Sequence, residues 1–115
     1  MSDAPFHKVD TVFVKVTDLA AAARWYTETL GWPELFHTEH IFVLRAPDGP
    51  PLTLLGPAAT EWSGFNFYAA DAEAAHAWLA ERDVEVGPVE RAPDQPVTWF
   101  WFRDPDGNRL EVCSY

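Results

Sequence analysis

Glu111 could act as a general base if a surrounding apolar cleft raises the pKa of its carboxyl group. The alternative is a structural role, in which the carboxylate is hydrogen-bonded to Thr11, Thr53 or Asn66 and holds parts of the chain together. The sequence leaves both interpretations open.

Trp99 and Trp101 are the second candidate feature, because their spacing puts them on the same side of a strand. Each indole buries about 150–250 Å². We therefore expect the pair to be covered by another part of the chain, a second subunit or a planar ligand, and core filling is the simplest alternative. Trp62 is a third candidate for the rim of a ligand site, whereas Trp25 and Trp78 lie on predicted helices and are expected in the core.

Cys113 is the only cysteine, which excludes a disulfide framework and a cysteine-rich zinc site. No histidine is placed by the sequence to activate the thiol, so an inert side chain is expected. The four histidines are His7, His37, His40 and His76.

The formal net charge of -10 argues against nucleic-acid partners and anionic membrane surfaces, which require clustered basic residues. Long-range attraction of a cationic ligand is compatible with such a charge. The chain shows no leader-like segment and no apolar stretch long enough to span a bilayer. The expected compartment is the cytoplasm.

The pattern of elements begins with a strand over residues 11–16, where apolar and polar residues alternate. Thr17 or Asp18 can then cap a helix that starts at Leu19 and ends at Gly31. Two apolar strands follow, at residues 41–44 and 52–55, and a Pro-Asp-Gly turn at residues 46–49 joins them.

The second half repeats this order with a strand at 65–68, a helix capped by Asp71, and a hairpin around the turn at 104–107. An internal duplication explains the repetition. We predict a single domain, 1–115, with one module at 9–55, a linker at 56–62 and a second module at 63–115.

Two segments, FVKVTDLAAAARWYTETLGW and FWFRDPDGNRLEV, resemble the opening and closing signatures of the vicinal oxygen chelate superfamily. This superfamily includes glyoxalase I, extradiol dioxygenases, fosfomycin-resistance enzymes and bleomycin-resistance proteins. The resemblance covers nearly the whole chain. It implies an α+β fold in which two βαβββ modules form a curled mixed sheet, with a concave ligand cleft and with helices on the outer face.

Strand alternation then divides the side chains between the helices and the cleft. Val12, Val14, Val16 and their counterparts in the second module should meet the helices. The expected ligand-binding residues are Thr11, Phe13, Ile41, Val43, Thr53, Trp62, Asn66, Tyr68, Trp99, Trp101, Glu111 and Cys113.

The resemblance also implies where metal ligands would stand, at Thr11, Thr53, Gly64 and Glu111. Only Glu111 is a strong ligand for a divalent ion, and none of the histidines matches a family ligand position. The sequence therefore predicts no metal and no cofactor.

The main functional hypothesis is a metal-independent protein that binds a small molecule, sequestering a planar or cationic antibiotic-like compound as bleomycin-resistance proteins do. The resemblance to those proteins implies a homodimer. The alternative is an enzyme of the same superfamily, a metal-dependent or Glu111-dependent lyase, isomerase or dioxygenase. A third hypothesis is an interaction module whose tryptophans contact another protein.

Overall fold

The computed structural model describes residues 4–57, 64–93 and 95–115, and these residues form two helices and eight strands in two compact units. The N-terminal unit spans Thr11–Gly64, and the C-terminal unit contains the residues up to Asp10 together with Phe65–Tyr115. The elements are β1 (Phe6–Lys15), α1 (Leu19–Leu30), β2 (Glu34–His37), β3 (Ile41–Leu44), β4 (Leu52–Leu55), β5 (Phe65–Ala69), α2 (Ala72–Ala80), β6 (Glu90–Arg91), β7 (Thr98–Arg103) and β8 (Arg109–Ser114).

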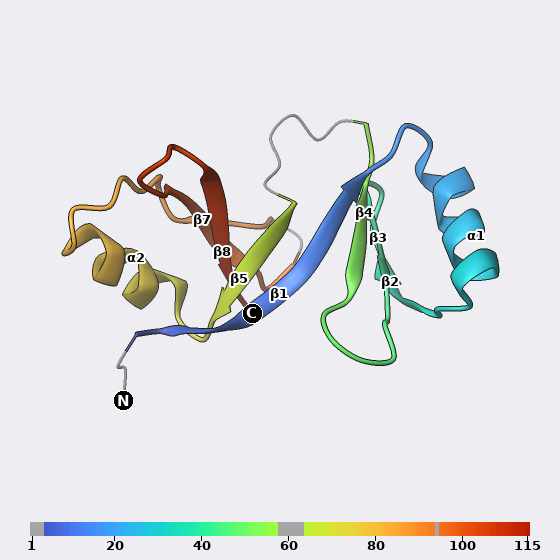
Figure 1. The fold of residues 1–115 in the computed structure, drawn as a ribbon, viewed down its shortest axis with the longest axis horizontal. Helices are drawn as coiled ribbons and strands as arrows, with labels where there is room; N and C mark the ends of the chain where they lie inside the picture. The colour runs from blue at the N-terminus through green and yellow to red at the C-terminus, as the bar shows by residue number, and fades with distance from the viewer. Residues whose placement is uncertain (1–3, 58–63, 94) are drawn as a thin grey trace. The chain divides into compact units, whose positions relative to one another are not determined.

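In the N-terminal unit the strands follow the order β2-β3-β4-β1, with β1 parallel to β4 and the other neighbours antiparallel. Helix α1 covers one face of these strands (Figure 1). Ala23, Leu44 and Leu54 form the buried centre of this unit. Val14 and Val16 pack against it as expected, whereas Val12 is 40% exposed.

Helix α1 begins and ends at the residues that the sequence indicates. The Asp18 carboxylate accepts a hydrogen bond from the Ala21 amide at 3.1 Å, which satisfies one of the free N–H groups of the first turn. Gly31 ends the helix with φ of 72°, a left-handed conformation that costs least at glycine.

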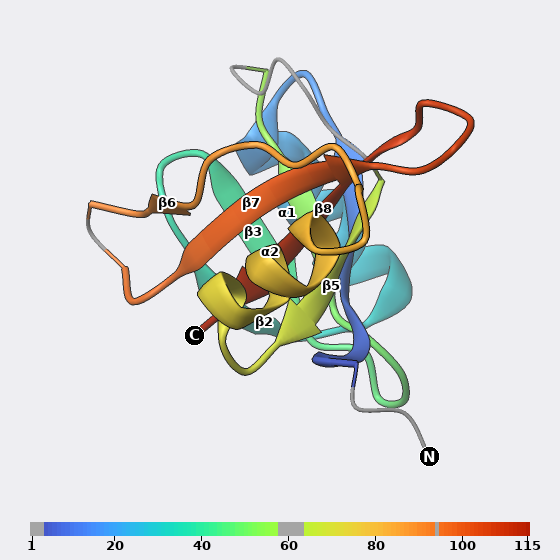
Figure 2. The same ribbon diagram turned by 90° about the vertical axis from the view of Figure 1, so that its left-hand side faces the viewer.

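In the C-terminal unit the order is β5-β8-β7-β6, with β5 parallel to β8 and the remaining pairs antiparallel. Helix α2 crosses one face of these strands (Figure 2). Ala69 at the end of β5 and Ala72 and Ala75 of α2 are buried with Phe100 and Val112. Their small side chains let the helix approach the sheet closely. Asp71 caps α2 by accepting from the Glu73 and Ala74 amides.

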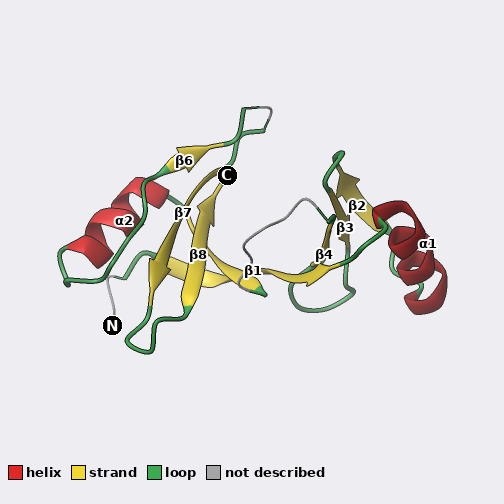
Figure 3. Ribbon diagram, turned by 90° about the horizontal axis from the view of Figure 1, so that it is seen from above, coloured by secondary structure: helices red, strands yellow, loops and turns green. Residues whose placement is uncertain are grey.

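The predicted α+β class with two βαβββ units and mixed strand pairing is confirmed (Figure 3). Strand β1 begins at Phe6, five residues before the predicted start, and the short strands β2 and β6 were not located from the sequence. The expectation that Trp25 lies in the core is wrong, because its side chain is 55% exposed on α1. No helix in the described part of the chain is long and apolar enough to cross a membrane.

Candidate functional site

Several polar and aromatic side chains of the C-terminal unit lie on the sheet face turned away from α2, which we call the helix-free face. Phe67, Phe100, Phe102 and Val112 pack toward α2. Because successive side chains of a strand point to opposite faces, the intervening residues lie on the helix-free face. They are Asn66, Tyr68, Trp99, Trp101, Arg103, Arg109, Glu111 and Cys113.

Glu111 occupies the middle of this face. The strand register places it directly opposite Trp101 on β7 and opposite Asn66 on β5. Directly opposed side chains of antiparallel strands such as β7 and β8 have Cβ atoms about 4.5–5.5 Å apart. The register therefore places Glu111 between a position that carries an indole and a position that carries an amide.

Trp101 is packed by its own unit. The guanidinium carbons of Arg109 and Arg103 lie 5.0 Å and 5.3 Å from the centre of its ring, within the range of cation–π contacts. A side chain at Gly87 would collide with the indole, so the absence of a Cβ there is what allows the ring to lie over the backbone. The Gly87 amide also donates to the Trp101 carbonyl at 2.8 Å.

Asp10 joins the two ends of the chain at the edge of the helix-free face. Its carboxylate accepts from the Tyr115 hydroxyl at 2.7 Å and from the Cys113 thiol at 3.4 Å. Burial, followed by the negative charge of Asp10, raises the pKa of the Cys113 thiol from its ordinary value. Desolvation at this contact and the hydrogen bond to Asp10 likewise raise the pKa of Tyr115, although 62% of that residue is exposed.

Tyr68 extends the Asp10 cluster with aromatic contacts. Its ring lies 4.8 Å from that of Tyr115, and the Lys8 ammonium lies 5.4 Å from its centre. The Asn66 amide donates to the Cys113 sulfur at 3.5 Å. The thiol is thus held between the Asn66 donor and the Asp10 acceptor, and neither of these partners is a histidine that could activate it.

The N-terminal unit places the remaining predicted residues on the face opposite α1. Phe42, Leu52 and Leu54 pack toward the helix, so the intervening Ile41, Val43 and Thr53 point to the other side. Thr11 and Thr53 are both buried, and their hydroxyl oxygens are 2.7 Å apart. The Thr11 hydroxyl is also 2.9 Å from the Pro51 carbonyl. Phe13 stands opposite Thr53 across β1 and β4.

These threonines do not fit a metal centre. Their hydroxyls are neutral and hydrogen-bond to one another, whereas divalent ions prefer carboxylate, imidazole or thiolate ligands. Gly64 offers no side chain, which leaves Glu111 as the one strong donor at the four expected positions. Among the residues that the structure describes, no group of three or more His, Cys, Asp or Glu could hold a metal ion.

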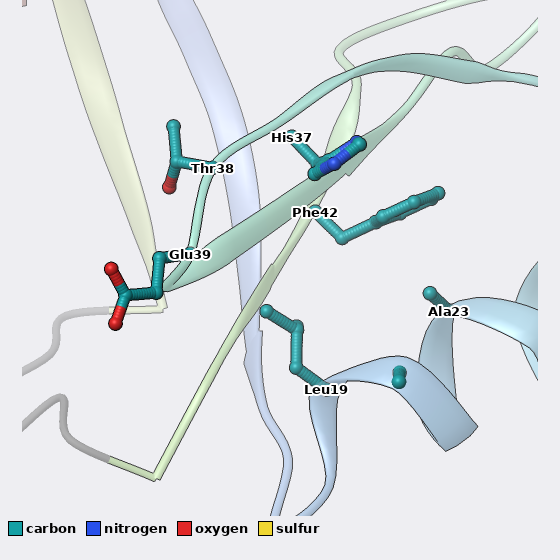
Figure 4. A pocket seen from close by; sticks show the side chains of 7 residues that line it. Leu19, Ala23, His37, Thr38, Glu39 and Phe42 are labelled. Atoms are coloured by element: carbon teal, nitrogen blue, oxygen red, sulfur yellow. The ribbon is translucent and has the colours of Figure 1, made fainter.

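An open pocket of about 520 Å³ lies elsewhere, between α1 and the β2–β3 hairpin. Figure 4 shows Leu19 and Ala23 of the helix facing Phe42, on which His37 stacks with a centroid distance of 5.8 Å. This pocket was not predicted from the sequence. It contains none of the predicted ligand-binding residues.

Each unit therefore gathers its own predicted residues on one sheet face, and Trp62 lies outside the described residues. Asp10, Gly87, Arg103 and Arg109 were not predicted from the sequence. The two arginines could have been found, because they share the strand parity of Trp101 and Glu111. Asp10 was missed because β1 was expected to begin after it. Gly87 was missed because no local sequence pattern indicates that a glycine will pack against a distant indole.

Comparison with known proteins identifies the family. The profile of the Glyoxalase/Bleomycin resistance protein/Dioxygenase superfamily matches residues 8–112. The chain belongs to this superfamily. No curated protein matches it.

Several solved structures of methylmalonyl-CoA epimerases are similar to this chain. One selenomethionine structure has a TM-score of 0.80 at 19% identity and covers 99% of both chains. A Streptomyces coelicolor epimerase in complex with 2-nitronate-propionyl-CoA has a TM-score of 0.77 at 20% identity, over 95% of this chain and 94% of that one. The Mycobacterium tuberculosis epimerase has a TM-score of 0.75 at 17% identity, over 99% and 91% of the two chains. Identities this low establish the shared fold alone.

Proposed function

We propose that this chain is an enzyme that transfers a proton at a carbon next to a carbonyl group, acting as an isomerase or lyase with Glu111 as the general base. The observation that carries the proposal is the position of Glu111 at the middle of the helix-free face, opposite both Trp101 and Asn66. The positions on either side of this base carry an indole and an amide.

The proposed reaction needs one carboxylate and no oxidant. Glu111 takes the proton from the α-carbon, and the electron pair of the broken C–H bond moves to the carbonyl oxygen to give an enolate. In an isomerase the pair then returns to carbon, and a proton from water on the face opposite Glu111 inverts the centre while the Glu111 carboxyl passes its own proton to solvent. Return of the Glu111 proton to the same face regenerates the substrate. In a lyase the pair instead expels a leaving group from the β-carbon.

Two findings support this proposal over a protein that only binds an antibiotic-like compound. The structural neighbours are named as methylmalonyl-CoA epimerases, and an epimerase inverts the configuration at one carbon. In addition, the ring of Trp101 already carries two guanidinium groups of its own unit, which would repel a planar cationic ligand. Dimer formation, a role in antibiotic resistance and the cytoplasmic compartment stay predictions from the sequence.

The donor set favours a metal-independent form of this chemistry. Thr11 and Thr53 stand at the positions where the resemblance implies ligands, and their hydroxyls are paired with one another. Glu111 can act as a base without an ion. We therefore assign the proton transfer to the carboxylate of Glu111, acting without a metal ion.

The experiment is deuterium exchange at the α-carbon, measured by NMR in D₂O. The panel consists of acyl-CoA thioesters, with methylmalonyl-CoA among them, and of small β-keto acids. We expect exchange with at least one compound, and a loss of about 100-fold or more in Glu111→Gln, the scale of a missing general base. Glu28→Gln is the matched control, because Glu28 is exposed on α1 and far along the chain from the proposed base.

Equal exchange in the wild-type chain and Glu111→Gln would remove the carboxylate from the mechanism. Failure of every panel compound to exchange would count against an enzyme and in favour of a binding protein.

A further inference from the structure

Strand β2 forms the outer edge of the sheet in the N-terminal unit. It pairs with β3 on one side, and on its other side no strand of the described chain pairs with it. All four of its residues are exposed, and they include the large apolar side chains of Leu35 and Phe36, which are 40% and 43% exposed. An unpaired edge that carries apolar side chains is a template on which another strand can pair.

A bulge in β2 gives Glu34 and His37 the same orientation. Glu34 is opposite Leu44 and His37 is opposite Phe42, so three steps along β2 correspond to two steps along β3. The extra residue in β2 compensates for the odd spacing, because side chains two steps apart on a strand share a face. The side chains of Glu34 and His37 therefore lie on one face, where the imidazole Nδ1 is 2.9 Å from a carboxylate oxygen.

The main-chain groups of Glu34 and His37 are directed to the free edge. The Pro33 carbonyl and the Thr38 amide, which flank these two residues, each form a hydrogen bond of 2.9 Å with the segment 41–45. Successive residues of an antiparallel strand direct their N–H and C=O groups to opposite edges. Since the flanking residues are bonded toward β3, the N–H and C=O groups of Glu34 and His37 face away from it.

We propose that β2 pairs with β2 of a second copy of this chain, antiparallel and around a two-fold axis between Leu35 and Phe36. In this register Glu34 of each copy faces His37 of the other, so a carboxylate stands beside an imidazole at both ends of the contact. The outward main-chain groups of these residues then form hydrogen-bonded pairs. A bulge ordinarily protects an edge strand from pairing, but two copies with the same bulge have the same spacing between Glu34 and His37.

The apolar side chains of β2 are compatible with the same register. Phe36 is opposite Val43, which points away from α1, so Phe36 lies on the face without a helix. The two-fold axis brings the Phe36 rings of both copies close together. A contact between two strands of four residues is small beside the 1,200–2,000 Å² that stable interfaces typically bury, and a net charge of -10 on each copy opposes it. The expected dimer is therefore weak and reversible.

Sedimentation velocity over a concentration series tests this pairing, at about 0.15 M salt so that long-range repulsion is screened. We expect the wild-type chain to dimerise reversibly. His37→Glu should weaken the dimer about tenfold or more, because two carboxylates then face each other at both ends of the contact. His7→Glu is the matched control, since it makes the same change at an exposed residue of the C-terminal unit and should dimerise like the wild-type chain.

A mixture of two variants separates pairing between copies from the contact within one chain. Glu34→Lys alone sets two lysines against two histidines and should also weaken the dimer. When it is mixed with His37→Glu, the introduced lysine faces the introduced glutamate at one end, and Glu34 faces His37 at the other. The mixture should therefore dimerise about as tightly as the wild-type chain, although the contact within each chain stays broken. Circular dichroism verifies that each variant is folded.

A wild-type chain that stays monomeric up to about 1 mM would overturn the inference. Dimers that persist undiminished in His37→Glu would overturn it as well, because the contact would then lie elsewhere on the chain. A mixture that stays as monomeric as its two components would do the same. Catalysis plays no part in these measurements, so their outcome is independent of the proposed function.

Discussion

The hydroxyl of Tyr115 donates a hydrogen bond to Asp10 at 2.7 Å, although the two residues are 105 positions apart in the sequence. Asp10 stands on β1 and Tyr115 directly follows β8. The bond ties the first strand to the last one within the C-terminal unit. Loss of this bond should be measurable as a fall in stability.

Replacing Tyr115 with Phe removes this hydrogen bond and leaves the aromatic ring in place. We expect the free energy of unfolding to fall by about 1 kcal/mol, less than the roughly 1.5–3 kcal/mol of a bond to a charged group, because the residue is largely exposed. Urea denaturation measures the change. Tyr68→Phe is the control, since the Tyr68 hydroxyl makes only a 3.4 Å contact with the Tyr115 carbonyl and should cost less. Equal losses in the two variants would contradict a specific role for Asp10.

Cys113 should react slowly with thiol reagents in the folded chain. Burial and the negative charge of Asp10 raise the pKa of its thiol, and alkylation requires the thiolate. We expect iodoacetamide to label the unfolded chain at pH 8 at least 100 times faster than the folded one. Asp10→Asn should speed labelling of the folded chain by removing the nearby charge. Rapid labelling of the folded wild-type chain would show that the thiol is accessible and ionised.

Stability should decrease at alkaline pH because of the same thiol. In the unfolded chain Cys113 loses its proton near the ordinary value of 9.0, whereas in the folded chain the raised pKa keeps it protonated. The folded state then binds more protons than the unfolded state, so the free energy of unfolding falls as pH rises above about 9. Cys113→Ala should flatten this part of the profile. A slope that is the same in Cys113→Ala would assign the alkaline loss to other groups.

Gly87→Ala should destabilise the chain by about 1–3 kcal/mol, the usual cost of forcing an extra methyl group into a packed region. The added Cβ would collide with the indole of Trp101. In the double variant Gly87→Ala/Trp101→Ala the collision is absent, so the two losses should not add. Denaturation of the four chains measures this coupling, and strict additivity would mean that the ring does not lie over Gly87.

The parts of the fold that depend on local chemistry were predictable from the sequence. Asp18 and Asp71 supply helix caps, and Gly31 supplies the left-handed residue that ends α1. Strand alternation correctly separated Phe100 from Trp101, because Phe100 and Phe102 share the face of β7 that packs toward α2.

Features that depend on packing were harder to predict. Trp25 was expected in the core because it is a large apolar residue on a predicted helix. At 100° per residue, however, it lies about 200° around the helix from the buried Ala23. The pairing of Asp10 with Tyr115 and Cys113 joins positions more than 100 residues apart. No local pattern specifies such a contact, and the short edge strands β2 and β6 likewise form because neighbouring strands offer them partners.

The most direct test of the account is the rate of α-proton exchange in the presence of a strong chelator, compared between the wild-type chain and Glu111→Gln. If Glu111 is the base and no metal takes part, the wild-type rate should be unaffected by the chelator, and the variant should be slower by about 100-fold or more. A wild-type rate that the chelator abolishes, together with an unchanged rate in Glu111→Gln before chelation, would contradict the central claim.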